Sequence, residues 1–302
     1  MWIYYGLLAA LFLGFHGICK KISVKDNKVI PVLFLTSLSG LIFISPIYFI
    51  SRLQPELAQN WGLYINPIEA KDHLLIFFKS LLMTFSWILG YSALKHLPIS
   101  IVSPIRAAGP FFTLLGALFI YGESPSIIQW AGFTMILISM WLYSKIGKLE
   151  GIDFRRNRWI IAIILATLFG ASSGLYDKFL IQYQSYEPQT VQFWFFFYVV
   201  TLVGIVLLWM NFKQPIQVKG IQWRWSIPFV GVLLVLADFS YFHGLQNKEA
   251  MIMLLSAVKR CQIFIAVFIG GWIFKEKNKK KKLIPLLGVF IGVLMILFAT
   301  TI

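Results

Sequence analysis

The chain has 302 residues, of which 59% are hydrophobic and 13% are charged, and its formal net charge is +15. A soluble domain carries about 25% charged residues, so the composition excludes an ordinary soluble protein. The apolar runs are continuous and favour membrane-spanning helices over the alternating strands of a β-barrel. Basic loops at a membrane surface account for the positive charge, and no nucleic-acid partner is expected.

Apolar stretches of about 20 residues recur along the chain, and each is long enough to cross a ~30 Å hydrocarbon layer. They predict ten transmembrane helices at about 2–19, 30–51, 73–94, 99–121, 126–145, 159–182, 190–212, 226–246, 250–274 and 283–301. The longest connection, 52–72, contains two prolines and a glycine and predicts a surface loop. The expected fold class is an all-α membrane protein.

Lysine and arginine are unevenly divided between the connecting loops. Loops after odd-numbered helices carry 19 of them, with Lys20 and Lys21 counted in the first loop, and loops after even-numbered helices carry 4. The positive-inside rule then places the odd loops in the cytoplasm and both termini outside the cell (inner) membrane.

The two halves of the chain share a sequence pattern. Positions 9, 11, 12, 17 and 21 match positions 166, 168, 169, 174 and 178 at an offset of 157, and Arg106 matches Lys259 at an offset of 153. Two units are expected, 1–148 and 159–302, joined by a basic connection at 149–158. Because each unit holds five helices, an odd number, the second must be inverted relative to the first, as in many transporters.

Two helix junctions carry a family resemblance. Residues 93–100 (ALKHLPIS), and 121–123 (YGE) followed by 129–132 (QWAG), resemble the junctions before and after the fourth helix of the EamA-type drug/metabolite transporter superfamily. The resemblance implies ten helices in two five-helix repeats over essentially the whole chain. The second half departs from the pattern, since Lys248-Glu249 replaces the Leu-Pro pair and no glycine precedes Glu276.

Three cations lie where a lipid-spanning sequence should carry none: Arg106, and the adjacent pair Lys259 and Arg260. A charge near the bilayer centre costs roughly 3 kcal/mol or more and usually serves function. Pro104 and Pro110 predict an irregular helix around Arg106, which is tolerated where the backbone lines a cavity. A guanidinium binds carboxylate or phosphate with two parallel hydrogen bonds, and an ammonium adds a compact charge, so the set predicts an anion site.

The other candidate substrate-binding residues lie one turn from these charges or on the eighth helix: Ser103, Ser256, Asp238 and Tyr241. Asp238 is also the clearest internal partner for the cations, and Asp177 is a second. Lys79 brings the intramembrane cations to four, so at least one positive charge is expected to remain unpaired. His16 has two open interpretations, a proton relay or a packing residue.

These patterns predict a secondary-active antiporter or other transporter that moves a small anionic metabolite, phosphorylated or carboxylated, by alternating access. An exporter of amino acids or other zwitterions, with the cations ion-paired, is one alternative, and a flippase for an anionic lipid-linked substrate is another. The cations are also similar to the phosphate-binding arrangement of the plastid triose-phosphate/phosphate translocators. That resemblance implies that Arg106, Lys259 and Arg260 clasp a phosphate.

No enzymatic activity is expected, because the sequence has no HExxH and no acidic diphosphate-binding cluster. No ATP-binding GxxxxGKS/T motif occurs either, so gradients or exchange would drive transport. The two cysteines suggest neither a disulfide nor a metal site, and no cofactor is expected. The expected partners are a small anionic substrate and the lipid bilayer, with a homodimer left open.

Overall fold

The computed structural model describes residues 2–107, 109–122, 126–148, 157–213, 221–247, 250–274 and 279–299. Within these residues every regular element is helical, which confirms the all-α prediction. Seven helices of the described residues are long and apolar enough to cross a membrane: Trp2–Val24, Val29–Leu53, Ala70–His96, Arg158–Tyr183, Pro188–Phe212, Ser226–Gln246 and Leu254–Ile273. Glu123, Glu276 and most of the predicted connection at 149–158 lie outside the described residues.

The helices of the first half are α1 (Trp2–Val24), α2 (Val29–Leu53), α3 (Pro55–Asn60), α4 (Ala70–His96), α5 (Ile99–Ala107), α6 (Gly109–Tyr121) and α7 (Ile127–Lys148). The second half begins with α8 (Arg158–Lys178), the π-helical segment η1 (Phe179–Tyr183), α9 (Pro188–Lys213) and α10 (Ser226–Gln246). It continues with α11 (Ile252–Val258), η3 (Lys259–Cys261), α12 (Gln262–Ile265), η4 (Ala266–Gly270), α13 (Gly271–Ile273) and α14 (Lys279–Phe298). The short helix α3 lies within the predicted loop at 52–72.

Local side-chain bonds explain where some helices begin and how they carry polar residues. The backbone N–H of Glu69 donates to the carboxylate of Asp72 at 3.1 Å and fixes the first turn of α4. Inside α4, the Ser80 hydroxyl donates to the Ile76 carbonyl at 2.8 Å, and the Thr84 hydroxyl donates to the Ser80 carbonyl at 2.7 Å. Such bonds satisfy hydroxyl groups without water, which a helix in lipid requires.

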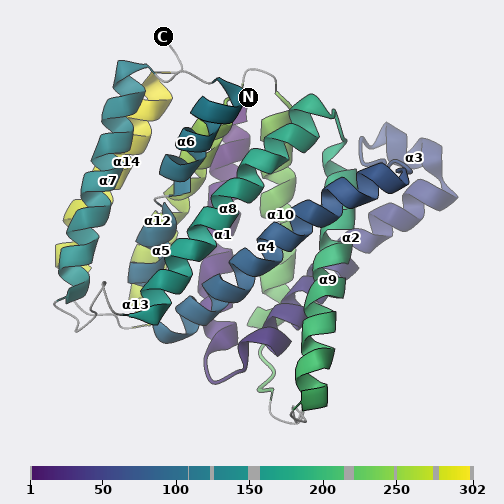
Figure 1. Ribbon diagram of the computed structural model, residues 1–302, viewed down its shortest axis with the longest axis horizontal. Coiled ribbons are helices and arrows are strands. Elements are labelled where there is room, and N and C mark those ends of the chain that lie inside the picture. Colours follow the sequence, from purple (N-terminus) through teal and green to yellow (C-terminus); the bar gives the residue numbers. More distant parts are fainter. Residues whose placement is uncertain are drawn as a thin grey trace.

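The two halves of the chain interlock in space. Helix α1 packs against α10, α4 packs against α8, and α2 packs against α9 and α10. The last helices of the two halves, α7 and α14, pack on each other at the left of Figure 1. Because helices of the two halves pack against each other, residues of both halves line a space within the bundle.

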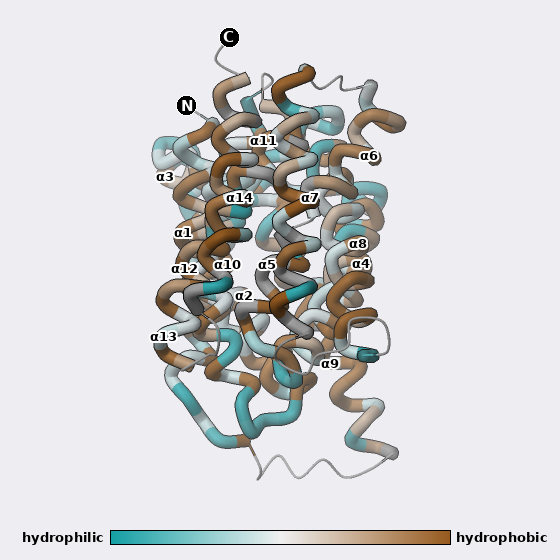
Figure 2. The backbone as a smooth tube through the Cα atoms, turned by 90° about the vertical axis from the view of Figure 1, so that its left-hand side faces the viewer, coloured by the Kyte–Doolittle hydropathy of each residue, from teal (hydrophilic) through white to brown (hydrophobic). Residues whose placement is uncertain are grey.

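The outer surface of the bundle suits a lipid environment. Phe119, Ile127 and Phe212 point outward with 86–89% of their area exposed. Figure 2 shows mostly hydrophobic helices, with hydrophilic segments in the connections at the lower end and also around α3. The protein is therefore a multi-pass membrane protein.

At each of two helix junctions, a single side chain donates hydrogen bonds to several backbone carbonyl groups. Near the lower end of Figure 1, Lys21 Nζ donates to the carbonyl oxygens of Leu94 and, at 2.6 Å, Leu97, between α4 and α5. In the second half, Gln182 Nε2 lies 2.9–3.3 Å from three carbonyl oxygens between α10 and α11, those of Leu245, Asn247 and Ala250. These bonds supply donors to carbonyl groups that helix ends leave unpaired.

Candidate functional site

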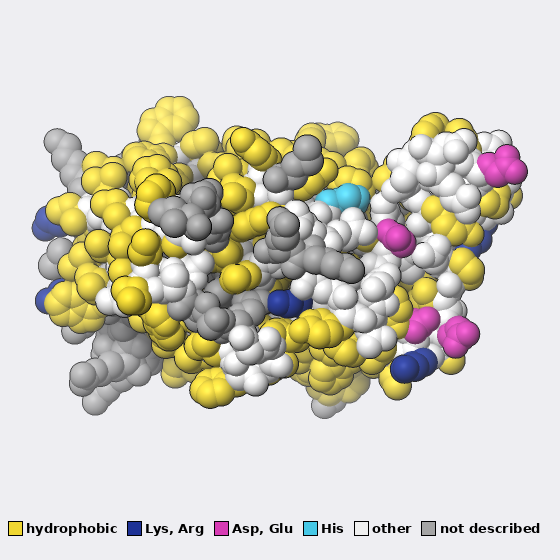
Figure 3. All heavy atoms as spheres, turned by 90° about the horizontal axis from the view of Figure 1, so that it is seen from above, with side chains coloured by type: hydrophobic (Ala, Val, Ile, Leu, Met, Phe, Trp, Pro, Cys, Tyr) yellow, Lys and Arg dark blue, Asp and Glu magenta, His cyan; other side chains and the backbone are white. Residues whose placement is uncertain are grey.

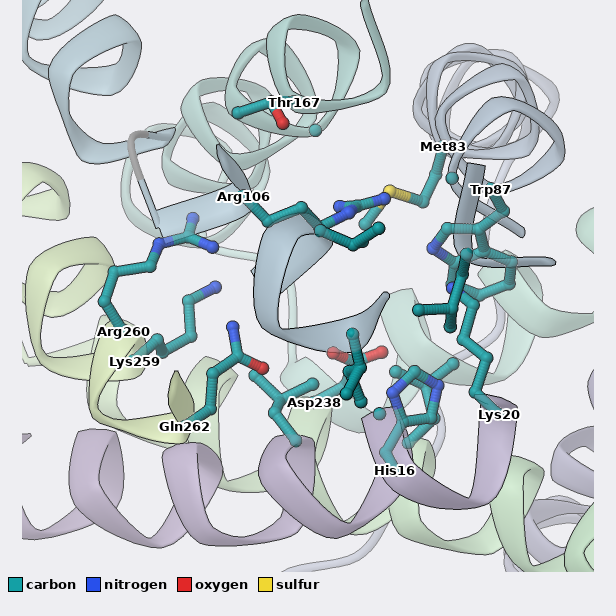
Figure 4. A pocket seen from close by; sticks show the side chains of 18 residues that line it. His16, Lys20, Met83, Trp87, Arg106, Thr167, Asp238, Lys259, Arg260 and Gln262 are labelled. Carbon is teal, nitrogen blue, oxygen red and sulfur yellow. The ribbon is translucent and has the colours of Figure 1, made fainter. Parts of the chain in front are cut away.

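A cavity of about 170 Å³ lies in the bundle, between α1, α4, α5, α8, α10 and the η3–α12 segment. Its polar lining residues are His16, Lys20, Trp87, Arg106, Thr167, Asp238, Lys259, Arg260 and Gln262, most of which Figure 4 shows pointing toward a common space. One buried water needs about 10–15 Å³ of such space, so the cavity has room for roughly ten waters or a small polar molecule.

The cavity extends toward one end of the bundle only. Leu94, Ile99 and Lys20 belong to its lining and lie near the ends of α4, α5 and α1 that face the lower end of Figure 1. Toward the opposite end, apolar side chains such as Trp2 and Leu245 form a buried cluster. Among the described residues, a buried apolar cluster therefore covers the cavity toward the end where α1 begins.

The two arginines of the site have no carboxylate partner among the described residues. Arg106 Nη2 lies 3.4 Å from the hydroxyl oxygen of Ser86, which donates its own hydrogen to the Ala166 carbonyl at 2.7 Å. The Nε atom of Arg260 is buried and has no hydrogen-bond partner in the described part of the chain. Buried donors without acceptors are costly, so both side chains favour an anionic occupant.

Each guanidinium lies against a glycine. A Cβ atom added to Gly90 would lie 2.7 Å from Arg106 Nη2, and one added to Gly109 would lie 2.6 Å from Arg260 Nη2. Any larger residue at either position would force the guanidinium to move. The two glycines thus position the two arginines.

The two lysines of the cavity each lie over a tyrosine ring. Lys259 Nζ is 3.3 Å from the centre of the Tyr241 ring, and Lys20 Nζ is 3.7 Å from that of Tyr91. Such contacts stabilise an ammonium only partly. The prediction that Lys20 lies in a loop was wrong, because α1 continues to Val24 and Lys20 is buried within it.

The acids do not neutralise these cations by direct contact. Asp238 lines the cavity but forms no ion pair with any cation that the structure describes. Asp177, the other expected partner, instead pairs with Lys79, with 2.8 Å between Lys79 Nζ and Asp177 Oδ1. At their usual charges, the described lining residues are four cationic side chains and one carboxylate, a formal excess of three positive charges.

Two expected site residues, Tyr241 and Ser256, are not among the described residues that line the cavity. Tyr241 is buried beneath Lys259, and Ser256 is buried in α11. Ser103 belongs to α5, but its side chain lies outside the described residues. Arg106, Lys259, Arg260 and Asp238 are brought together, whereas Tyr241 can act only through Lys259.

The helix that carries Lys259 and Arg260 departs from regular α-helical geometry. Lys259 and Arg260 lie in the 3₁₀ turn η3, and a π-helical turn, η4, follows after α12. Short 3₁₀ and π segments inside helices often mark functional positions, and here they lie next to the cations.

The sequence of this chain matches a known family of proteins. A model of the EamA-like transporter family matches residues 1–145 and 157–298. The chain belongs to the EamA-like transporter family. Members of this family are membrane transporters.

Two curated relatives of this EamA-like transporter are the pseudopaline exporters CntI of Pseudomonas aeruginosa strains UCBPP-PA14 and ATCC 15692. Each is 24% identical over 185 residues, which cover 60% of this chain and 59% of the relative. A solved crystal structure superposes with a TM-score of 0.69 over 97% of this chain and 95% of its own, at 14% identity. That similarity shows a shared fold.

Lys20 lines the cavity of this EamA-like transporter and was not expected there from the sequence; Gln262, three residues after Lys259, also lines it. Lys20 follows the apolar stretch of the first helix, so it was assigned to the basic loop. Its position four residues after His16 was the available signal, because residues at this spacing share one helix face. Among the described residues, no group of His, Cys, Asp and Glu side chains is arranged to hold a metal ion.

The glycines give a prediction about how the arginines are positioned. We expect Gly90→Ala and Gly109→Ala each to weaken anion binding about tenfold, because the added methyl displaces a guanidinium from its hydrogen-bonding position. Binding to the purified variants is measured by calorimetry. Gly271→Ala is the matched control, because a Cβ there meets no atom within 4 Å. Unchanged affinity in both site variants would show that the arginine positions do not matter.

Proposed function

We propose that this EamA-like transporter moves a small anionic metabolite, phosphorylated or carboxylated, by alternating access. The observation that carries the proposal is the formal excess of three positive charges in a cavity that a buried apolar cluster covers toward one end. Buried guanidinium and ammonium groups are retained where an anion pairs with them. The family supports transport in general, and the unpaired cations support the anionic class.

The proposed architecture is ten transmembrane helices in two inverted five-helix units, 1–148 and 159–302. The family model matches the chain in two segments, 1–145 and 157–298, which fits this division. Arg106 and Lys259, paired by the sequence repeat, line one cavity. In transporters with inverted repeats the substrate site lies between the two units near the middle of the membrane.

The proposed location is the cell inner membrane, with both termini outside. The uneven distribution of Lys and Arg supports this orientation. Figure 3 views the end where α1 begins and shows both carboxylates and Lys or Arg side chains there. Exposed acids described near that end are Glu56, Glu69 and Glu187. The cavity would then open toward the cytoplasm.

Asp238 favours a second candidate, an exporter of zwitterionic metabolites. Its carboxylate faces the cavity without an ion-pair partner among the described residues, so it is free to bind a substrate amine. The CntI relatives are exporters, which agrees with outward movement. A flippase has no comparable support, because the cavity is lined on all described sides by helices of this chain.

The test is thermal unfolding of the purified protein against four sets of metabolites: phosphorylated, carboxylated, zwitterionic and neutral. A ligand at one hundred times its Kd adds about 2.7 kcal/mol to the free energy of unfolding. We expect phosphorylated or carboxylated compounds to raise the unfolding temperature. Stabilisation by zwitterions alone would favour the second candidate, and stabilisation by neutral or cationic compounds alone would contradict the anionic class.

A further inference from the structure

Lys20 is a buried cation with no described partner other than an aromatic ring. It is 7% exposed and lines the cavity, and its ammonium has no hydrogen-bond or ion-pair partner among the described residues. The Tyr91 ring beneath it is held by a 3.1 Å hydrogen bond between the Tyr91 and Thr36 hydroxyls. A buried ammonium that has no described acceptor is suited to binding an anionic group.

Lys20 is also separated from the other lysine of the site. In Figure 4, Lys20 lies with Trp87 on one side of the cavity, Lys259 and Arg260 lie on the other, and Arg106 lies between them. We infer that Lys20 forms a second anion subsite, so that the substrate carries two anionic groups at opposite ends of a short chain. The inference rests on the proposed function, because it assigns a second group to the same substrate.

The sequence repeat shows that this subsite exists in one half only. At the offset of 157 that relates α1 to α8, Lys20 corresponds to Asp177 and Gly17 to Gly174. Gly17 lines the cavity, and a Cβ there would meet nothing within 4 Å, whereas one at Gly174 would lie 3.8 Å from the Tyr241 hydroxyl. The space beside Gly17 is thus open, whereas the Tyr241 hydroxyl borders the space beside Gly174.

Alternating access gives this asymmetry a consequence. When inverted halves exchange conformations, the position of Lys20 closes and that of Asp177 opens. The Lys20 ammonium then no longer lines the cavity, and the Asp177 carboxylate lines it instead. In the structure described here, Asp177 pairs with Lys79. A substrate with two anionic groups is therefore held more weakly when the site faces the end where α1 begins, and it is released there.

The experiment compares Lys20→Gln with the unmodified protein in calorimetric binding of four probes. Succinate and 3-phosphoglycerate carry two anionic groups, and butyrate and glycerol 3-phosphate carry one. We expect Lys20→Gln to weaken binding of the probes with two anionic groups roughly 10- to 100-fold. Binding of the probes with one anionic group should weaken less than about twofold. Lys25→Gln is the matched control, because Lys25 is exposed just beyond α1, and it should change neither set.

Each outcome has a distinct meaning. If Lys20→Gln weakened binding of both probe sets equally, or of neither, the second subsite would be overturned. The proposal of an anionic transporter would not be affected. Absence of binding of all four probes to the unmodified protein would count against both proposals. In vesicles of known orientation, the half-saturation concentrations of succinate at the two faces should differ, and Lys20→Gln should reduce that difference. Equal values at both faces of the unmodified protein would overturn the release argument.

Discussion

Replacement of Arg106 or Lys259 by alanine should abolish transport and leave the fold intact. Each substitution removes a cation expected to bind the substrate anion, and we expect binding to weaken at least about 100-fold. Neither cation is ion-paired with a described acid, so its removal leaves no carboxylate without a partner. The unfolding temperature of the empty protein should therefore stay the same or rise, because an uncompensated buried charge is lost.

Uptake into reconstituted vesicles and ligand-dependent unfolding temperature measure the two effects separately. Arg158→Ala is the control, because Arg158 is an exposed arginine at the start of α8. Uptake by Arg106→Lys should fall between that of the alanine variant and that of the unmodified protein. Lysine keeps the positive charge but cannot form the two parallel hydrogen bonds of a guanidinium. Normal uptake by both alanine variants would assign these cations a structural role and refute the proposed site.

Asp177→Asn should destabilise the protein by about 3 kcal/mol or more. Lys79 is 2% exposed, and its ammonium lies 2.8 Å from the Asp177 carboxylate and over the rings of Phe195 and Phe242. Removing one partner of a buried ion pair leaves the other charge uncompensated, which typically costs about 3–5 kcal/mol. Thermal or denaturant unfolding of the empty protein measures the change.

An exposed ion pair provides the matched control. Arg224 lies 3.2 Å from Asp26, whose side chain is 56% exposed, and Asp26→Asn should cost less than about 1 kcal/mol. The double substitution Lys79→Met with Asp177→Leu should recover most of the lost stability, because it removes both charges together. A loss for Asp177→Asn no larger than that for Asp26→Asn would mean that the buried pair does not stabilise the fold.

The sequence predicted the helices and the meeting of the cations because both follow from strong local signals. Apolar stretches of membrane-spanning length predict helices, and an isolated charge within such a stretch indicates a candidate functional position. The repeat then related Arg106 to Lys259 without any knowledge of packing. The structure places both in one cavity.

Other features depended on packing that the sequence does not contain. The partner of Asp177 is Lys79, 98 positions earlier, and the choice depends on how α4 packs on α8. Helical periodicity placed Ser256 on the same face as Lys259, but whether a residue of α11 reaches the cavity depends on which helices pack against α11. Lys20 was missed because a polar residue after an apolar stretch is equally compatible with a helix or a loop.

The surplus positive charge in the cavity has an electrical consequence. A charge carried across the whole membrane potential changes the free energy by about 2.3 kcal/mol per 100 mV. With three surplus charges, the membrane potential would change the free energy of reorienting the empty site by up to about 7 kcal/mol per 100 mV. A bound dianion leaves one surplus charge, and the change is then about 2.3 kcal/mol per 100 mV. If the site reorients as proposed, the membrane potential would therefore bias the orientation of the empty site about three times more strongly than that of a site that holds a dianion.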